Sequence, residues 1–245
     1  MKVLAVIPAR YASTRFPGKP LALIAGRPMI QWVWEGVSRI SVISDAVVAT
    51  DDTRIFDTVL GFGGRAMMTA STHRSGTDRC GEVLDRMDSD ADVIVNVQGD
   101  EPRVEHTQIE LLASCFDDPS VQIATLKKEI TSTDDLFSPN VVKVVDDLKG
   151  NAIYFSRNPI PFVRGKADDE WLQHHKFYKH IGIYAFRREV LQQVVRLPQS
   201  QLETCESLEQ LRWIENGYRI AVRETDAENI GVDTPEDLAK LQMEQ

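Results

Sequence analysis

The chain has 245 residues, and its 28 Lys and Arg against 37 Asp and Glu give a formal net charge of −9. This charge argues against a nucleic-acid binder that works by bulk electrostatics, although a local cluster of cations can still bind an anion. No run of about 18 apolar residues is present, so we expect no membrane-spanning segment. Three distant cysteines without a CxxC pair predict a reducing cytoplasm and no disulfide framework.

Short apolar runs alternate with amphipathic stretches, which predicts βαβ units around a mainly parallel sheet with helices on both faces. The runs are rich in Val and Ile and continuous, as expected of strands that are covered on both sides. The expected strands are Val3–Ala9, Ala46–Thr50, Val93–Val97, Val121–Leu126, Val141–Val145, Ile181–Phe186, Ile220–Val222 and Asn229–Val232. Composition marks no domain boundary, so we expect a single domain over residues 1–245.

Several residues are typical of helix ends. Pro28 is expected as the first residue of a helix that continues through 29–40, and Thr107–Glu110 fits a capping box. Thr234 followed by Pro235 predicts another helix start, and Gly217 is expected to close the helix that precedes it.

The loop after the first expected strand, residues 8–20, carries three cations (Arg10, Arg15 and Lys19) and no acid. Such a loop can hold a polyphosphate with backbone N–H groups and cationic side chains, although its spacing is not that of a Walker A motif. A merely solvated basic turn would have the same charge. Its position favours phosphate binding, because ligands of open α/β sheets bind beyond the carboxyl ends of the strands.

Single acids follow two other expected strands. Asp100 comes after Val93–Val97, and Asp233 comes after the last strand. Carboxylates at two strand ends beside a phosphate loop predict a Mg²⁺ ion held between protein and nucleotide. Asp233 could instead cap the next helix, where Thr234 competes for that role. Asp51-Asp52 is the rival metal pair, with Asp52 expected to be a helix N-cap.

Other polar segments are less specific. Ser75-Gly76-Thr77 can present donors to a base or ribose, but a loop that ends in an N-cap Thr77 has the same sequence. Glu206, Glu209 and Gln210 can share one helical face, which by spacing alone is typical of a solvated surface. Residues 164–179, with His174-His175, lack periodicity and are expected to form a long surface excursion rather than a metal site.

Taken together, nine segments match one family in order. They are Ile7–Pro20, Val48–Asp51, Ser75–Arg79, Val95–Pro102, Asn140–Val145, Tyr154–Arg157, His180–Tyr184, Leu208–Arg212 and Gly231–Leu238. The sequence resembles the 3-deoxy-manno-octulosonate (Kdo) cytidylyltransferases over nearly its whole length. One departure is Arg74, which stands where many members have Gln.

The resemblance implies a nucleotide-diphospho-sugar-transferase-like α/β fold, a cytoplasmic homodimer and dependence on Mg²⁺. It implies the reaction of CTP with Kdo to give CMP-Kdo and pyrophosphate, which supplies lipopolysaccharide synthesis. It further implies a nucleotide-binding part at about 1–130 and a sugar-binding and dimerisation part at about 131–225. No nucleic-acid or membrane partner is expected.

Residue by residue, the resemblance implies three groups. The catalytic group is Arg10, Lys19, Asp100 and Asp233, of which Asp100 and Asp233 would hold Mg²⁺. The nucleotide-binding group is Ala9, Arg10, Ser13, Lys19, Ser75, Gly76, Thr77 and Asp100. The sugar-binding group is Gln98, Arg157, His180, Tyr184, Glu209 and Gln210, with Arg157 expected to pair with the sugar carboxylate. His180 is interpreted as a hydrogen-bond partner of the sugar rather than a general base.

Three rival functions stay open at this point. The first is cytidylyl transfer to 8-amino-Kdo or a sialic acid. The second is a metal-dependent glycosyltransferase that would use Asp51-Asp52, and the third is a nucleotide sensor without catalysis.

Overall fold

The computed structural model describes residues 1–12, 16–227, 231–232 and 234–243. Its strands are β1 (Val3–Ala9), β2 (Leu23–Ile24), β3 (Arg27–Pro28), β4 (Asp45–Thr50), β5 (Ala66–Met68), β6 (Val93–Asn96), β7 (Ile123–Ile130), β8 (Lys143–Asp146), β9 (Ala152–Ser156), β10 (Phe177–Arg187) and β11 (Ile220–Glu224). The helices are α1 (Met29–Ser38), α2 (Thr53–Gly61), α3 (Gly76–Arg86), α4 (His106–Ser114), α5 (Thr133–Phe137), α6 (Trp171–His174), α7 (Arg188–Val194), α8 (Gln201–Glu206), α9 (Gln210–Glu215) and α10 (Pro235–Met243).

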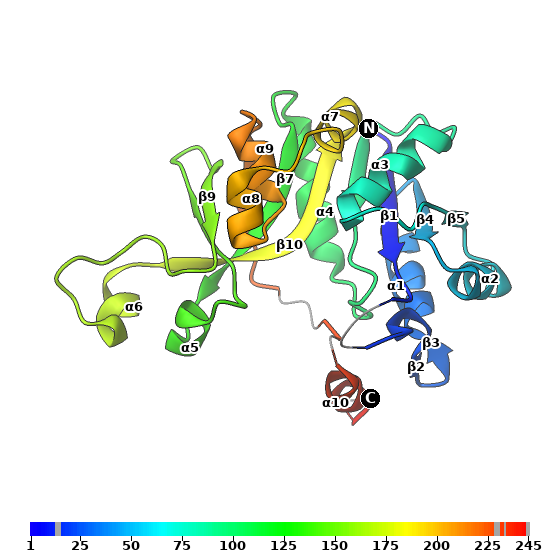
Figure 1. The fold of residues 1–245 in the computed structure, drawn as a ribbon, viewed down its shortest axis with the longest axis horizontal. Coiled ribbons are helices and arrows are strands. Elements are labelled where there is room, and N and C mark those ends of the chain that lie inside the picture. Colours follow the sequence, from blue (N-terminus) through cyan, green and yellow to red (C-terminus); the bar gives the residue numbers. More distant parts are fainter. Residues whose placement is uncertain (13–15, 228–230, 233, 244–245) are drawn as a thin grey trace.

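One mixed sheet organises the molecule, in the order β11-β7-β10-β6-β1-β4-β5 (Figure 1). The pairs β1–β4, β1–β6, β4–β5 and β7–β11 are parallel, whereas β10 runs antiparallel to both of its neighbours, β6 and β7. The predicted mainly parallel sheet is therefore confirmed. Along this path, β10 is the one reversed strand and joins two parallel halves, whereas β8 and β9 lie off the path and pair in antiparallel fashion.

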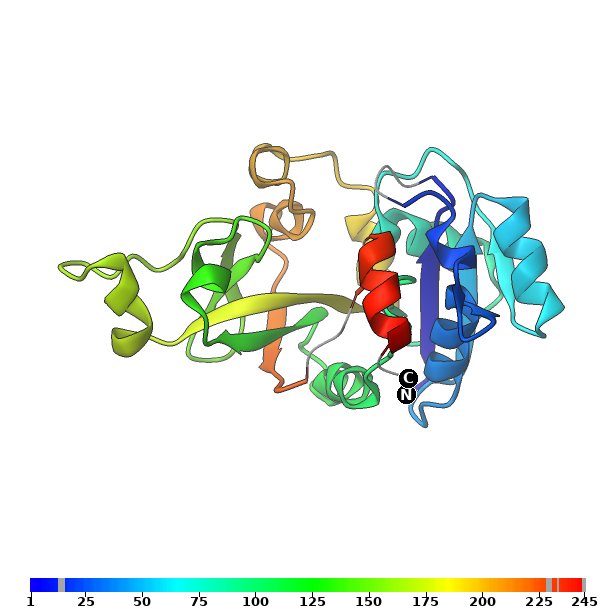
Figure 2. The same cartoon turned by 90° about the horizontal axis from the view of Figure 1, so that it is seen from below.

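Helices cover both faces of this sheet, as predicted. Alternate residues of β1 point to opposite sides, because strand side chains have a period of two: Val3, Ala5 and Ile7 pack with α1, α2 and α4, and Leu4 and Val6 pack with α3, α7 and α9. Figure 2 shows α4 on one side of the strands and α8 and α9 on the other. None of the described helices is both long and apolar enough to cross a bilayer.

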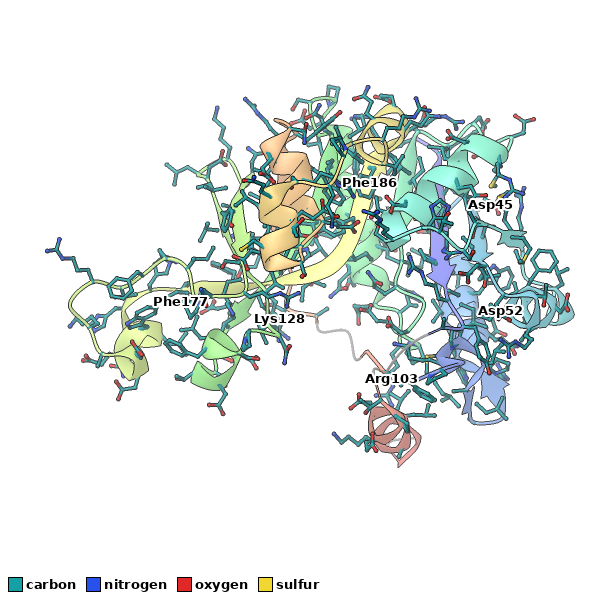
Figure 3. All side chains as sticks on the ribbon, viewed as in Figure 1. Asp45, Asp52, Arg103, Lys128, Phe177 and Phe186 are labelled. Carbon is teal, nitrogen blue, oxygen red and sulfur yellow. The ribbon has the colours of Figure 1, made fainter. Side chains whose placement is uncertain are left out.

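An arm extends from the sheet along β10 and carries β8, β9, α5 and α6 (Figure 1). In Figure 3, Phe177 lies in this arm and Phe186 lies in the body, at opposite ends of β10. The arm has its own small core of Ile130, Leu136, Trp171 and Phe177. Residues 164–179 form the predicted surface excursion, and within it Trp171 buries its ring and anchors the short helix α6.

Other expectations about local structure need correction. The expected capping box at Thr107 is absent, because α4 begins at His106 with Glu105 as its N-cap residue. Pro28 is the N-cap residue of α1 rather than its first helical residue. The sequence patterns do not predict the strands β2, β3, β5 and β9. Of the expected strand Asn229–Val232, residues 231 and 232 are not in a strand, and 229 and 230 lie outside the described residues.

Candidate functional site

The basic loop and the acid after β6 meet at one edge of the sheet. The loop folds back where the Gly18 N–H donates to the Tyr11 carbonyl (2.9 Å), and Gly18 adopts a left-handed backbone (φ 72°). Directly after this turn, Lys19 Nζ lies 2.6 Å from Asp100 Oδ2, and the Asp100 side chain is 33% exposed. Arg10 follows β1 directly and is partly buried. The predicted neighbourhood of this cationic turn and Asp100 is therefore present.

Two glycines allow the chain segments to approach closely here. A Cβ on Gly99 would lie 2.6 Å from the Pro8 carbonyl oxygen, which no real side chain tolerates. A Cβ on Gly76 would lie 3.3 Å from Pro8 Cγ and 3.4 Å from Asn96 Nδ2. The start of α3 and the loop after β6 are thus packed against the end of β1, which brings three predicted motifs together.

The last motif reaches the same place through its backbone. The Val232 N–H donates to the Asp100 carbonyl at 2.9 Å. Asp233, the second expected metal ligand, and Ser13, an expected nucleotide contact, lie outside the described residues. After them in the chain, Thr234 Oγ1 accepts from the Asp237 N–H (3.2 Å), so the predicted capping role of Thr234 is confirmed.

Helix α3 begins two residues earlier than an N-cap at Thr77 would place it. Its N-cap is Ser75, whose hydroxyl accepts from the Asp78 N–H, while the Asp78 carboxylate accepts from the Ser75 N–H. Thr77, the cap that the sequence pattern suggests, is instead buried within the first turn. Its hydroxyl donates to Glu209 Oε1 at 2.8 Å.

Thr77 and Glu209 belong to a buried polar cluster that also includes Asn96 and Tyr184. Asn96 Nδ2 donates to Thr77 Oγ1 (3.4 Å), and Asn96 stands opposite Tyr184 in the β6–β10 register. Within the described part of the chain, Asn96 Oδ1, Tyr184 Oη and Glu209 Oε2 are buried without a hydrogen-bond partner. Burial raises the pKa of Glu209, and burial followed by the nearby Glu209 charge raises the pKa of Tyr184.

A cavity of about 780 Å³ opens above this cluster. It is lined by Arg74, Ser75, Asp78, Gln98, His180, Gly182, Tyr184, Leu197, Pro198, Gln199, Glu203, Thr204, Ser207, Leu208, Glu209, Gln210 and Arg212. Five of the six predicted sugar-binding residues are therefore brought together, from three separate segments of the chain. Buried polar atoms without partners beside a concave surface are typical of a ligand site.

Gln98 and His180 occupy defined positions in the cavity wall. Gln98 Nε2 donates to the Gly182 carbonyl at 2.7 Å, which joins the loop after β6 to β10. His180 Nε2 lies 2.9 Å from Thr125 Oγ1. Burial lowers the pKa of His180 to about 3, so its ring is neutral near pH 7.

Arg157 lies elsewhere. Its guanidinium donates to the carbonyls of Glu206 (2.7 Å), Pro139 (2.9 Å) and Ser207 (3.4 Å), and among the described residues it does not line the cavity. The expectation that Glu206, Glu209 and Gln210 share one helical face is wrong. Ser207 takes a left-handed conformation (φ 53°) that separates α8 from α9. As predicted, α9 closes at Gly217, whose N–H donates to the Ile214 carbonyl.

The rival acid pair has structural partners. Asp52 is the predicted N-cap of α2 and accepts from the Arg54 N–H. Asp51 Oδ2 accepts from Arg79 Nη2 at 3.2 Å, and the Arg79 side chain is fully buried. Both acids are thus engaged in holding helices on the sheet.

Asp100 fits one half of a Mg²⁺ ligand set. Its carboxylate is partly exposed at the carboxyl end of β6, and carboxylate oxygens are the ligands that Mg²⁺ takes in phosphate-binding sites. Lys19 Nζ lies within hydrogen-bond distance of the Asp100 carboxylate, so a cation is present where the negative phosphates would bind.

Sequence reasoning missed two residues beneath the cavity, Asn96 and Thr125. Asn96 is the polar interruption in the apolar run Val93–Val97, which was a usable signal. Thr125 gave no signal, because Thr is common in strands and its partner His180 is 55 residues away.

Comparisons with known proteins find close sequence relatives of this chain. The family model described as "Cytidylyltransferase" matches residues 4–222. The chain is 55% identical over 244 residues to the 3-deoxy-manno-octulosonate cytidylyltransferase of Parabacteroides distasonis, covering 98% of this chain and 96% of that protein. It is 52% identical over 249 residues to the protein of the same name from Geobacter sulfurreducens, covering 98% of each chain.

Solved structures of other proteins have a similar fold. A structure of CMP:2-keto-3-deoxy-manno-octonic acid synthetase complexed with CTP superposes with a TM-score of 0.91 at 44% identity, covering 99% of this chain and 98% of that one. A structure of 4-diphosphocytidyl-2C-methyl-D-erythritol synthase from Anaerococcus prevotii has a TM-score of 0.63 at 15% identity, covering 99% and 96%, and shares the fold.

Proposed function

This chain belongs to the cytidylyltransferase family, and we propose on that premise that it transfers CMP from CTP to the anomeric hydroxyl of Kdo. The products are CMP-Kdo and pyrophosphate, and the CMP-Kdo serves lipopolysaccharide synthesis. The observation that carries the proposal is the contact of Lys19 with Asp100 at the sheet edge, beside a polar cavity of about 780 Å³. Such a site can hold a triphosphate and a polyhydroxylated acid next to each other.

The nucleotide would occupy the edge at the ends of β1 and β6. The sugar hydroxyl attacks the α-phosphorus, and the bond from this phosphorus to the pyrophosphate oxygen breaks. Arg10 and Lys19 would neutralise the triphosphate, since the protein's main task in this reaction is to orient two anions and offset their charge. Ala9, Ser13 and the start of α3 (Ser75, Gly76) would contact the same nucleotide.

We propose Asp100 and Asp233 as the Mg²⁺ ligands. When bound, Mg²⁺ would neutralise phosphate charge and lower the pKa of the attacking hydroxyl. Lys19, now paired with Asp100, would release that carboxylate and turn to the phosphates when CTP enters. Val232, the residue directly before Asp233, supports this assignment, because its N–H donates a hydrogen bond to the Asp100 backbone carbonyl at the same edge.

The sugar would lie in the cavity on Gln98, His180, Tyr184, Glu209 and Gln210. The unpartnered oxygens of Tyr184 and Glu209 provide a donor and an acceptor for sugar hydroxyls. The cation for the sugar carboxylate is either Arg157, as the family motif suggests, or Arg74, whose side chain lines the cavity.

A pyrophosphate-release assay tests the function. Purified protein with CTP, Mg²⁺ and Kdo is expected to release pyrophosphate and form CMP-Kdo, and chelation of the metal should abolish turnover until Mg²⁺ is restored. Parallel reactions with 8-amino-Kdo and a sialic acid identify the preferred acceptor. Turnover of a preformed nucleotide sugar, without any pyrophosphate from CTP and Kdo, would refute the proposal in favour of a glycosyltransferase.

We also propose that the protein is a cytoplasmic homodimer that associates through the 131–225 part. The support is apolar surface on the arm: Phe162 is 72% exposed and Ile153 is 57% exposed, and Ile153, Ile160 and Phe177 line a cavity of about 690 Å³. Light scattering should give twice the chain mass, and Phe162→Asp should shift it to the monomer. A monomeric wild-type protein would refute this assembly.

A further inference from the structure

The ring of His180 is held from several sides. Its backbone N–H donates to the Val142 carbonyl at 2.8 Å. Phe155 meets the imidazole edge-on with ring centroids 5.0 Å apart, and Tyr184 packs against it at 5.2 Å. Because the ring lines the cavity and is held in place, its protonation pattern decides what it offers a ligand.

The partner of His180 inside the protein is the hydroxyl of Thr125. Thr125 is fully buried in β7, opposite an irregularity where the β10 register jumps from Ile181 to Tyr184. Its Oγ1 lies 2.8 Å from the Ile183 carbonyl oxygen and 3.2 Å from the Ile181 carbonyl oxygen. The same Oγ1 lies 2.9 Å from His180 Nε2.

The single proton of the Thr125 hydroxyl decides which of these groups donate and which accept. A threonine hydroxyl has one proton to donate and two lone pairs that accept. The carbonyl oxygens of Ile183 and Ile181 can only accept. If Thr125 gave its proton to His180, both carbonyls would face its oxygen with no proton between them, an unsatisfied arrangement that is costly in a buried place. Thr125 therefore donates to a carbonyl, and His180 Nε2 donates to Thr125.

We propose that Thr125 is a positioning residue that fixes His180 as the Nε2–H tautomer, so that Nδ1 accepts a hydrogen bond from a hydroxyl of the sugar substrate. The inference rests on the proposed function for the identity of that substrate. The lowered pKa of His180 agrees with it, since a ring that stays neutral has one donor nitrogen and one acceptor nitrogen.

The assignment has a chemical consequence. His180 cannot donate to the sugar, because its only proton is held by Thr125. It selects for a hydroxyl that donates, so it contributes to substrate binding and orientation rather than to proton transfer. Loss of Thr125 should therefore weaken sugar binding while the binding of CTP is kept.

Nitrogen NMR of the full-length enzyme labelled with ¹⁵N-histidine reads the tautomer directly, without substrate. The His180 signals are assigned by their loss in His180→Gln. We expect a protonated Nε2 and an unprotonated Nδ1 at neutral pH, in the wild type and in Thr125→Ser. Thr125→Val, which lacks the hydroxyl, should shift His180 toward the other tautomer. Ile123→Val, a similar small loss on the same face of β7, is the matched control and should leave the His180 signals unchanged.

Kinetics then test the role in binding. Thr125→Val should raise the KM for Kdo by about tenfold, with kcat and the KM for CTP little changed, because one hydrogen bond of typical strength is lost from substrate binding. Thr125→Ser should restore the wild-type KM. A protonated Nδ1 in the wild type would overturn the proposal whether or not Thr125→Val folds, and so would an unchanged KM in a folded Thr125→Val. Because NMR needs no substrate, a wild type that ignored Kdo would refute the proposed function separately.

Discussion

Thr77 and Glu209 are 132 residues apart, and the Thr77 hydroxyl donates a 2.8 Å hydrogen bond to Glu209 Oε1. This contact ties the first turn of α3, in the proposed nucleotide site, to the floor of the proposed sugar cavity. The Thr77 hydroxyl, which the sequence analysis assigns to nucleotide binding, is therefore engaged with Glu209 instead. The bond matters because the Glu209 carboxylate is shielded from water, and burial raises its pKa.

Thr77→Val keeps the shape of Thr77 and removes this donor. Glu209 then loses a partner that stabilises its charged form, so its pKa should rise further and its orientation should loosen. We expect the KM for Kdo to rise by about tenfold, from the loss of roughly 1.4 kcal/mol. Steady-state kinetics measure this, with Thr77→Ser as the control that keeps the hydroxyl. An unchanged KM for Kdo in Thr77→Val would show that Glu209 needs no such support.

Lys19→Ala should chiefly weaken the binding of CTP. A charge-assisted contact to phosphate contributes about 1.5–3 kcal/mol, so the KM for CTP should rise by roughly ten- to a hundredfold. Lys2→Ala is the matched control, because Lys2 also pairs with an aspartate, Asp90, but on the exposed surface. Equal KM values for CTP in the wild type and Lys19→Ala would remove Lys19 from the triphosphate site.

Asp100→Asn should fold and lose turnover by several orders of magnitude. The amide keeps the size of the side chain but removes the charge that a Mg²⁺ ligand needs. Turnover with Mg²⁺ and circular dichroism of the same preparation separate catalysis from folding. Near-normal turnover of Asp100→Asn would exclude Asp100 as a metal ligand.

Two roles for Arg157 can be separated with a substrate analogue. If Arg157 pairs with the sugar carboxylate, Arg157→Ala should abolish the preference of the enzyme for Kdo over its carboxamide. The contacts of its guanidinium with three backbone carbonyls predict the other result: the preference stays, and the melting temperature falls by several degrees. Arg74→Gln is the companion variant. If Arg74 is the cation that pairs with the sugar carboxylate, this variant should lose the preference, whereas an unchanged preference would remove Arg74 from that role.

The lowered pKa of Glu82 predicts how the free energy of unfolding changes at acid pH. Burial alone would raise its pKa, but the Ala70 N–H, His73 and Arg86 together lower it from 4.5 to about 2. Because the folded pKa is the lower one, the stabilisation is complete above the unfolded value and is lost as the pH falls from about 4.5 to about 2. Denaturant unfolding at several pH values should therefore show a loss below pH 5 that is smaller in Glu82→Gln. Glu110→Gln, on an exposed part of α4, should unfold like the wild type.

Much of the fold could be predicted because apolar patterns are local. Strand β1 has the predicted bounds, and the inner strands β4 and β6 differ by one residue at an end, since their Val and Ile residues are buried on both faces. The arm was not predictable in this way. Trp171 and Phe177 are buried only against Ile130 and Leu136, which are more than 30 residues away, so the segment between residues 164 and 179 carries no periodic signal of its own.

The sequence by itself determined the sheet, its two covered faces and the motifs at the strand ends, because these depend on residue type and short spacing. Only the tertiary structure decided what the polar side chains contact. Its hydrogen bonds join Thr77 to Glu209, Arg157 to backbone carbonyls and Thr125 to His180. The physical reason is that a buried polar atom is stabilised by a partner within about 3 Å, and whether an atom lies there, and which one, is set by the packing of segments that are far apart in the chain.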